Sequence, residues 1–351
     1  MEKHGKYSKR HKAIVRRRIF LVCIASALAI CVAMLGIIIN AVIKSSNSFG
    51  VDSDINSSQS EEAQSETVDP NKVVATATVV NTGDIILHST VLDGAKTADG
   101  NYDFSAFFTA AQDYFKKADL ATANFEVTLG GTESGAFSGY PAFNSPDTLL
   151  DTITNSGIGF LTTANNHCYD TGLYGLKRTV QQLKAKNISF SGTKESENDP
   201  TYIVKDVNGI KIGMVSYTYE NTADEGKKSI NGNIVASEAN GLINSFSYDR
   251  IESFYTEAQS VIDSMNRDGA DAVVFYMHWG EEYQLSANTW QKSIAQKLCD
   301  MGVDVIVGGH PHVVQPIELI HSIDSQNTTV CIYSMGNAIS KQHHEVDFGM
   351  M

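Results

Sequence analysis

Cysteine is scarce in this sequence, which has five among 351 residues. Cys23 and Cys31 lie in one long apolar segment, and Cys168, Cys299 and Cys331 are far apart in the rest of the chain. This spacing matches no zinc knuckle and no disulfide framework. We therefore expect any metal ligands to be nitrogen and oxygen atoms rather than thiolates.

Basic residues are also scarce after residue 18. Those residues carry eight Lys and Arg side chains against Glu2 alone, a net charge of +7. The whole chain has a net charge of −13, so the remainder carries −20. An acidic body repels polyanions at long range, which argues against nucleic-acid binding. An anionic substrate would need a metal or a local basic group to hold it.

Charged residues are absent from 19–43, a segment of 25 residues that is long enough to cross a bilayer. The basic flank before it predicts that 1–18 is a cytoplasmic tail and that the chain after the anchor is extracellular. A cleaved signal peptide is the alternative, but its apolar core is shorter and ends at a cleavage site of small residues. We therefore predict a single-pass protein of the cell membrane.

Large apolar residues are rare in 44–72, which is rich in Ser, Asn, Gln, Asp and Glu. Such a segment buries too little surface to fold by itself, so we expect a flexible acidic stalk. A single folded domain is predicted over 73–351. Its last residues, 347–351 (DFGMM), resemble the start of a strand. We therefore expect the natural chain to continue beyond Met351.

Strand-like and helix-like segments alternate through the predicted domain, which is typical of α/β proteins with much parallel sheet. The helix-like segments are 104–117, 145–156, 173–186, 251–267 and 289–301. The strand-like segments are 73–80, 120–125, 158–163, 211–217, 272–277, 303–307 and 330–333. Residues 221–250 have weak periodicity and are expected to form a surface insertion, and 128–144 a loop near a site.

Polar side chains recur at the carboxyl ends of these strands. The clearest case is His310-Pro311-His312, which follows an apolar strand and a Gly-Gly turn. The other polar residues at strand ends are Asp84 and His88, Asn124 and Glu126, Asn165, Asn166 and His167, His278 with Trp279, and Asn337. In a parallel sheet these ends share one edge, where open α/β folds bind their ligands. Carboxylate, amide and imidazole ligands together favour a divalent ion such as Mn, Zn or Fe.

One or two such ions would make hydrolytic chemistry available, because bound metals activate water and polarise a phosphoryl or carbonyl oxygen. His167 follows the candidate ligand Asn166 directly. It is our candidate for the catalytic residue that protonates a leaving group. The alternative is a structural role, in which its ring orients Asp84 or Asn166 through a hydrogen bond.

Six segments, taken in order, resemble the motifs of the CapA (PgsA) family of poly-γ-glutamate capsule synthesis proteins. They are 82–87 (TGDIIL), 123–126 (ANFE), 164–172 (ANNHCYDTG), 278–283 (HWGEEY), 309–316 (GHPHVVQP) and 333–337 (YSMGN). That family is similar to the calcineurin-like metallophosphoesterases. The resemblance implies a four-layer α/β/β/α sandwich with a metal site at its strand ends, preceded here by one transmembrane helix.

The resemblance also implies roles for individual residues. The metal-ligand positions fall on Asp84, Glu126, Asn166, His278, His310 and His312, and the catalytic position falls on His167. Residues expected to support the ligands or contact substrate are His88, Asn124, Asn165, Trp279, Glu281 and Asn337. Typical metallophosphoesterases begin with Asp-x-His, whereas Ile85 and Ile86 follow Asp84 here. This departure leaves one tightly held ion, or a weakly occupied pair, as the expectation.

Three functions are consistent with the sequence. The first is a membrane-anchored protein of capsule biosynthesis or export with a metal-dependent hydrolase site, acting on a phosphoester or a γ-amide. The second is an extracellular phosphoesterase unrelated to capsule, and the third is a scaffold without turnover. The resemblance implies membrane-associated polymer synthetase components and an anionic cell-surface polymer as partners.

Overall fold

The computed structural model describes residues 75–223 and 226–342. The chain divides into two units, Met1–Lys72 and Val73–Met351, and the described residues all belong to the second. The predicted cytoplasmic tail, membrane anchor and stalk lie outside the described residues, as do the last residues of the chain. Within the described ranges, no helix has both the length and the apolar character needed to cross a bilayer.

Two sheets form the framework of the described unit. In the first sheet, all neighbouring strands are parallel and the order is β15-β1-β2-β3-β4. These strands are β1 (Val79–Ile85), β2 (Leu120–Phe125), β3 (Ile158–Thr162), β4 (Ser189–Ser191) and β15 (Asn337–Ile339). The last described strand therefore pairs directly with the first, and Asn337 lies opposite Asp84.

The second sheet is mixed, with the order β10-β6-β11-β12-β14-β13 and with β5 beside β6. Its strands are β5 (Ile203–Val207), β6 (Ile210–Tyr219), β10 (Ser245–Phe246), β11 (Ala272–His278), β12 (Val305–Gly309), β13 (Ile317–His321) and β14 (Thr328–Ile332). Its centre is parallel, whereas β5 and β13 are antiparallel to their neighbours. β6 is buried along most of its length, as expected for a strand covered on both faces.

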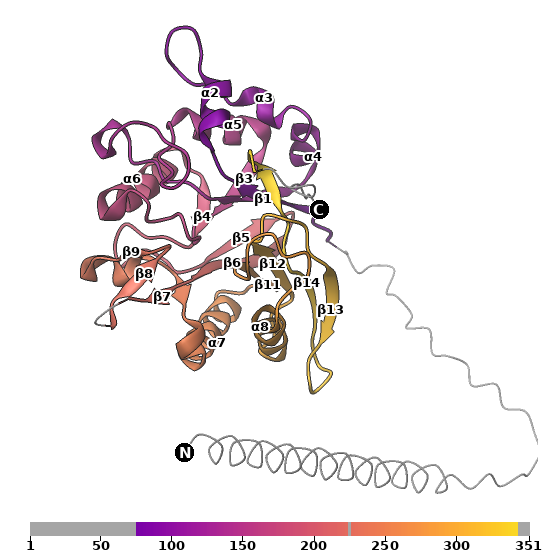
Figure 1. Ribbon diagram of the computed structural model, residues 1–351. Helices are drawn as coiled ribbons and strands as arrows, with labels where there is room; N and C mark the ends of the chain where they lie inside the picture. Colours follow the sequence, from indigo (N-terminus) through magenta and orange to yellow (C-terminus); the bar gives the residue numbers. More distant parts are fainter. Residues whose placement is uncertain (1–74, 224–225, 343–351) are drawn as a thin grey trace, which may run out of the picture. The chain divides into compact units, whose positions relative to one another are not determined.

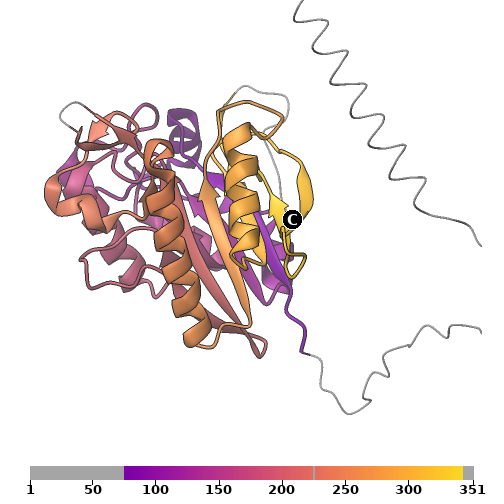
Figure 2. The ribbon, with the colours of Figure 1, turned by 90° about the horizontal axis from the view of Figure 1, so that it is seen from below.

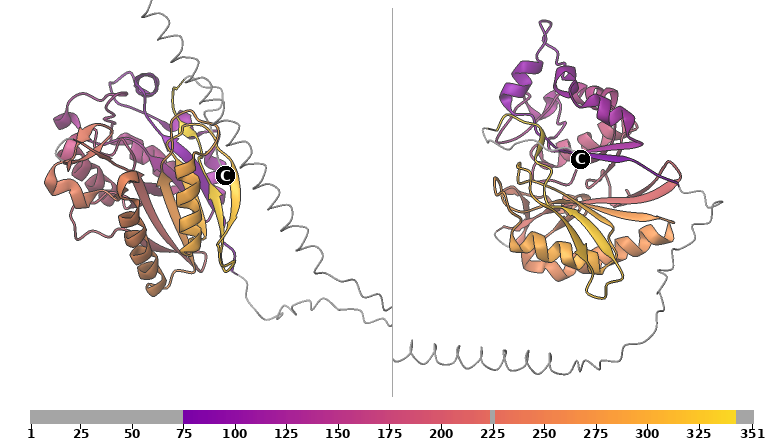
Figure 3. Two further views of the ribbon diagram at one scale, coloured as in Figure 1. Left: turned by 60° about the horizontal axis from the view of Figure 1, so that its bottom comes forward. Right: turned by 90° about the vertical axis from the view of Figure 1, so that its right-hand side faces the viewer.

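Helices cover the outer face of each sheet (Figure 1). They are α2 (Ser89–Ala95), α3 (Ser105–Phe108), α4 (Gln112–Lys117), α5 (Thr148–Ser156), α6 (Gly172–Ala185), α7 (Ile251–Arg267) and α8 (Thr289–Asp300). Figure 3 shows α2 to α5 on the far side of the first sheet, and Figure 2 shows α7 and α8 lying along the second. The described unit is thus an α/β fold with its layers in the order α/β/β/α.

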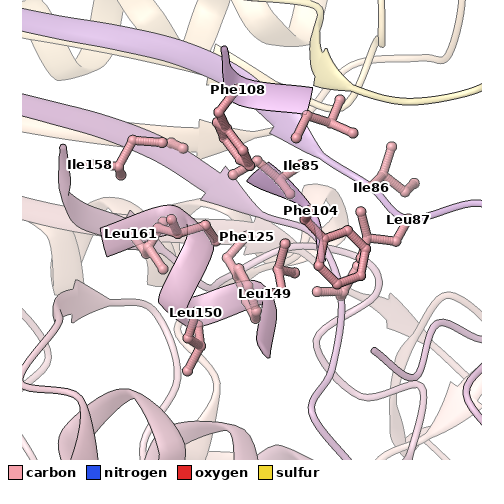
Figure 4. Packing of buried hydrophobic residues seen from close by; sticks show 14 of the residues in the cluster. Ile85, Ile86, Leu87, Phe104, Phe108, Phe125, Leu149, Leu150, Ile158 and Leu161 are labelled. Atoms are coloured by element: carbon pink, nitrogen blue, oxygen red, sulfur yellow. The ribbon is translucent and has the colours of Figure 1, made fainter. Parts of the chain in front are cut away.

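Three apolar clusters hold these layers together. One packs α2 to α5 on the first sheet through residues such as Ile85, Phe104 and Leu149 (Figure 4). Another packs α7 and α8 on the second sheet. The third lies between the sheets, where Phe160 of the first meets Tyr276 of the second with ring centroids 5.4 Å apart. Removing this apolar surface from water drives the layers together.

Local sequence explains where the outer helices begin and end. In α7, apolar residues recur at Phe254, Ala258, Val261 and Met265, so one stripe of the helix faces the sheet. α8 begins with a capping box, in which the Asn288 side chain accepts from the backbone of Gln291 and the Gln291 side chain accepts in return. These features account for the agreement between the predicted and observed ranges of both helices.

Two sequence predictions about elements were wrong in detail. The helix predicted over 104–117 is broken into α3 and α4, because the backbone between them tightens into short-range bonds such as Ala111 N to Phe108 O. The first strand was predicted over 73–80, whereas β1 begins at Val79 and continues to Ile85. Asp84 therefore lies inside the end of the strand, fixed by pairing with β2 and β15 on both sides.

The predicted surface insertion has structure of its own. It contains a small antiparallel sheet of β7 (Asn221–Thr222), β8 (Lys228–Ile230) and β9 (Asn233–Ile234), followed by η3 (Ser237–Leu242). Ile230, Val235 and Leu242 pack against Tyr169 and Leu176 near the start of α6. Two further short 3₁₀ segments are η1 (Thr132–Ser134) and η4 (Tyr248–Arg250). The insertion thus borders the edge where the parallel strands end.

Candidate metal centre

The candidate centre is the cluster formed where the carboxyl ends of the two sheets meet. It comprises six residues from five strands or the turns after them, namely Asp84, Glu126, Asn166, His278, His310 and His312. All six side chains are buried, with at most 5% of each residue exposed. Burial of so many polar groups is costly unless they are paired or hold an ion.

The Gly308-Gly309 turn allows the sheets to approach at this point. A Cβ at Gly308 would stand 1.9 Å from the Tyr333 carbonyl oxygen, and one at Gly309 would stand 2.7 Å from Asp84 Oδ1. Glycine at 309 therefore lets β12 lie against β1, and glycine at 308 lets it lie against the residue that follows β14. The chain then turns through positive φ angles of 93° at His310 and 57° at His312, conformations that non-glycine residues rarely adopt. The strained turn directs both imidazoles into the cluster.

Asp84 links the first sheet to this turn. Its Oδ2 accepts from the backbone N–H of His310 at 3.2 Å and lies 3.2 Å from His312 Nδ1. His312 Nδ1 also lies 3.0 Å from Asn337 Oδ1. Asp84 and Asn337 are neighbours in the register of β1 and β15. Strand pairing therefore sets the orientation of the His312 ring.

Glu126 lies at the middle of the cluster, just after β2. Its Oε2 accepts from Asn124 Nδ2 at 3.1 Å. Its Oε1 is buried and has no hydrogen-bond partner among the described residues, although it lies 3.6 Å from His278 Nε2 and 3.7 Å from His312 Nε2. An orphaned carboxylate oxygen between two imidazoles is the arrangement expected of a metal ligand.

Asn124 supports the carboxylates rather than joining the ligand groups. Its Nδ2 donates to Asp84 Oδ1 at 2.8 Å as well as to Glu126. Its Oδ1 accepts from Thr162 Oγ1 and from Asn165 Nδ2. Asn165 also donates to the Phe125 carbonyl and accepts from the His167 backbone N–H. These two amides thus fix the loops that carry Glu126, Asn166 and His167.

His278 and Asn166 meet on the other side of Glu126. His278 Nε2 lies 2.9 Å from Asn166 Oδ1, and the ring centroid of His278 is 4.9 Å from that of His310. The Tyr219 ring lies 5.0 Å from His310, and its hydroxyl bonds the Asn166 side chain. Tyr219 was not among the residues predicted from sequence.

The cluster offers two buried ligand triads. They are Glu126 with His278 and His310, and Asp84 with Glu126 and His312, and in each the three donor atoms lie within 4.8 Å of one another. Glu126 belongs to both triads. His310 Nδ1, like Glu126 Oε1, is buried without a partner among the described residues. Nitrogen and oxygen donors of this kind fit one or two divalent ions of the Mn, Fe or Zn type.

The electrostatics of the cluster agree with a cation. Burial, followed by repulsion from Asp84, raises the pKa of Glu126 well above its ordinary value. Burial lowers the pKa of His310 to about 3 and lowers that of His278 strongly, so both rings are neutral near pH 7. Burial also acts to lower the pKa of His312, but the hydrogen bond and charge of Asp84 outweigh it and the net shift is upward. Neutral imidazole is the form that binds metals.

His167 lies beside the cluster and is held by a residue that the sequence analysis did not assign. Its Nδ1 is 2.8 Å from Asp170 Oδ2, which also accepts from the Phe143 backbone N–H at 2.7 Å. The Phe143 ring packs edge-on against His167 with centroids 4.6 Å apart. The ring therefore contacts Asp170 through Nδ1 rather than bonding Asp84 or Asn166.

The other predicted residues occupy varied positions. His88 is half-buried near His167 and His312, and burial, followed by the charges of these two rings, lowers its pKa. Trp279 is fully buried and donates to the Tyr333 carbonyl at 2.9 Å, so it supports the core of the second sheet. Glu281 and Glu282 are both exposed, but a carboxylate oxygen of Glu282 lies within 4.8 Å of donor atoms of His310 and His312, so these three residues could hold an ion.

Asp170, Tyr219 and Glu282 are thus the residues that sequence analysis missed. Asp170 follows His167 by three residues, a spacing that allows contact within one turn. Glu282 stands next to the chosen Glu281 within the segment HWGEEY, and no local pattern distinguishes the two. Tyr219 ends a strand without any distinctive flanking pattern. Only the first of the three carried a usable signal.

The chain matches the family described as "Bacterial capsule synthesis protein PGA_cap" over residues 78–342. It belongs to this capsule synthesis family. Two curated relatives are the capsule biosynthesis protein CapA of Bacillus anthracis, 27% identical over 269 residues, and the PGA biosynthesis protein CapA of Bacillus subtilis (strain 168), 28% identical over 242 residues. The alignments cover 76% and 68% of this chain, but only 60% and 57% of those proteins.

Some solved structures are also similar in part to this chain. One is the sulfate thiohydrolase SoxB of Thermus thermophilus, with a TM-score of 0.36, 16% identity, and coverage of 66% of this chain and 37% of that chain. Another is a second protein of Thermus thermophilus, with a TM-score of 0.38, 9% identity, and coverage of 75% of this chain and 91% of that chain. These scores are too low to transfer any function to this chain.

Proposed function

We propose that this protein is a membrane-anchored, extracellular component of poly-γ-glutamate capsule biosynthesis or export, and that its candidate centre is a metal-dependent hydrolase site. Membership of the capsule synthesis family supports the first part. The two buried triads that share Glu126 support the second, and this is the observation on which the proposal mainly depends. The anchor is the apolar segment 19–43, and its partners would be membrane-associated synthetase components.

The residues divide the work of hydrolysis between them. Asp84, Glu126, His278, His310 and His312 would hold one or two divalent ions, with Asn166 beside them. When bound, such ions lower the pKa of a water molecule and polarise the oxygen of a carbonyl or phosphoryl group. Burial of these side chains places the reaction in a medium of low dielectric constant, where electrostatic interactions are strong.

His167 and Asp170 supply the proton transfer in this proposal. The Asp170 carboxylate lies 2.8 Å from Nδ1 of the ring, and this contact fixes the orientation of the ring. The protonated ring donates from Nε2 to the leaving nitrogen or oxygen as the bond breaks. A buried imidazole held by a buried carboxylate beside the ligand triads is an arrangement that proton transfer can use, and this supports the enzyme over the scaffold.

Metal content and turnover of the full chain test the proposal. We expect about one or two equivalents of Mn, Fe or Zn in the wild type, lost in the His310→Ala, His312→Ala double variant. His321→Ala is the matched control, because His321 is exposed on β13. Hydrolysis of a γ-linked glutamate oligomer and of an aryl phosphate is then compared.

Metal binding with cleavage of the oligomer would support the proposal as written. Cleavage of the aryl phosphate alone would favour a phosphoesterase unrelated to capsule. A wild type that holds no metal after incubation with Mn and Zn would exclude the hydrolase mechanism and leave the scaffold.

A further inference from the structure

A second polar cavity, of about 400 Å³, lies at the carboxyl ends of β4 and β6. We call it the lysine cavity and define it by the five charged residues that line it, which are Lys194, Glu220, Lys228, Arg250 and Glu257. Three of these are cations in a chain whose segment after residue 18 carries a net charge of −20. A local gathering of positive charge is therefore unusual in this protein.

Most of these charges already have partners. Glu220 lies 3.3 Å from Lys228 Nζ and 2.7 Å from an Arg250 nitrogen, so it serves both cations. Lys228 Nζ also donates to the Asn240 and Ile243 carbonyl oxygens at 3.1 Å each. Glu257 accepts from the Tyr217 hydroxyl at 3.0 Å. These contacts make the walls of the cavity rigid.

Lys194 is the exception. It is half-buried, and its Nζ donates to Thr201 Oγ1 at 2.7 Å. Within the described residues it forms no ion pair. Burial lowers its pKa, and the charges of Glu257, Asp199 and Glu197 oppose this effect. A desolvated ammonium group without a carboxylate partner is stabilised by an anion that enters the cavity.

The cavity adjoins the candidate centre through the end of β6. Tyr219 contacts His310 and Asn166, while the next residue, Glu220, lines the lysine cavity. On the other side, a Cβ on Gly192 would stand 2.3 Å from the Ala164 nitrogen, so the turn before Lys194 packs on the loop that carries Asn166. A ligand extended along this edge can thus reach both places.

We propose that the lysine cavity is a carboxylate-binding subsite in which Lys194 is the principal donor. The lining groups sum to three positive and two negative charges, a surplus of one that matches a monoanion. The two fixed carboxylates would repel a phosphate dianion. Taken with the proposed hydrolase function, on which this choice of substrate rests, the subsite would hold one carboxylate of an acidic chain while a neighbouring bond lies at the candidate centre.

Calorimetric titration of the full chain with γ-linked tri-glutamate tests the assignment. The measurements are made in the His310→Ala, His312→Ala background, so that the candidate centre adds no metal-dependent binding. Lys194→Met keeps the aliphatic stem and should weaken binding about tenfold or more, because a hydrogen bond to a charged group is lost. Lys194→Arg should restore most of the affinity. Lys292→Met, on the exposed face of α8, should leave it unchanged.

Two further probes identify the ligand chemistry. The tetraamide of the same peptide, in which the three α-carboxylates and the terminal γ-carboxylate are all replaced, should bind at least about tenfold more weakly than the free acid. Inorganic phosphate should not compete with the free acid at similar concentrations. Phosphate binding that is tight and depends on Lys194 would overturn the carboxylate assignment. Near-ultraviolet circular dichroism checks that Lys194→Met and the background chain are both folded. If the two folded proteins then bind tri-glutamate with equal affinity, the subsite is overturned.

Failure of the subsite and failure of the proposed hydrolase function give different results. Loss of tri-glutamate binding in Lys194→Met, in a protein whose wild type cleaves nothing, would support the subsite and contradict the hydrolase. If Lys194→Met instead keeps its turnover with an unchanged KM, the hydrolase is supported and the subsite is contradicted.

Discussion

The two sheets contribute different chemistry to the candidate centre. The first sheet supplies the carboxylates and amides, including Asp84, Glu126 and Asn166, whereas the second supplies all three imidazoles of the cluster. Each buried triad draws on both sheets. Neither sheet alone therefore supplies a complete triad, and both triads form only because the sheets meet at Gly309. The functional unit is the junction of the layers rather than either layer.

Replacing Glu126, the donor that both triads share, should have the largest effect on metal affinity. Glu126→Gln keeps the shape of the side chain but takes one charged ligand from both triads. We expect metal affinity to fall by more than the roughly 10–100-fold typical of outer hydrogen-bond partners. His278→Ala removes a donor from one triad only and should leave partial occupancy. Mass spectrometry of bound metal gives both values, and equal losses in the two variants would contradict the shared role of Glu126.

Asp170→Asn should separate proton transfer from metal binding. The variant loses the carboxylate oxygen that holds Nδ1 of His167, so the ring is no longer oriented for proton transfer and kcat should fall by about 10²-fold or more, within the range for general acid catalysis. Metal content and KM should stay close to wild type, because Asp170 touches none of the triad donors in the described contacts. Unchanged kcat would show that Asp170 has only a structural role.

Gly309→Ala should push the two sheets apart where they join. The added Cβ would meet Asp84 Oδ1 at 2.7 Å, and overpacking of this kind costs about 1–3 kcal/mol of stability. Gly159→Ala is the control, since a Cβ there meets only Leu120 Cδ1 at 3.5 Å, an ordinary contact. Urea unfolding measures the free energy of unfolding of both variants. If Gly309→Ala leaves this free energy unchanged, the two sheets are packed more loosely at the junction than the geometry indicates.

The neutral imidazoles of the second sheet should make the metal-free protein sensitive to acid. The pKa of His310 is about 3 when folded against an ordinary value of 6.5, so the unfolded state binds the proton first as pH falls below 6.5. This residue should therefore remove up to about 2 kcal/mol of stability between about pH 7 and pH 5. In His310→Gln, the free energy of unfolding measured with urea should decline less steeply over that pH interval. His321→Gln, with its exposed ring, should follow the wild type.

Sequence was sufficient for the parts of the fold that depend on local pattern. The helices predicted over 251–267 and 289–301 are observed over nearly the same residues, and the polar residues predicted at successive strand ends do gather at one edge. Membership of the capsule synthesis family, recognised from six short segments, is confirmed. The membrane anchor and the extracellular location stay predictions.

The features of the site that sequence analysis did not predict depend on packing between distant segments. No local pattern shows that Glu126 Oε1 stays unpaired, or that Glu282 rather than Glu281 approaches His310. The lysine cavity was likewise invisible, because Lys194 and Arg250 are brought together by the crossing of β4, β6 and the insertion. Such groupings follow from the meeting of layers, which sequence periodicity does not specify.

The meeting of β15 with β1 has a consequence for the order of events during synthesis. The bond from the His310 backbone to Asp84 joins residues 226 positions apart, and the strand carrying Asn337 is added later still. Contacts of such long range form slowly and late. The ribosome must therefore release nearly the whole domain before the ligands assemble. The proposed metal could therefore meet an assembled set of ligands only after the residues through β15 have been synthesised.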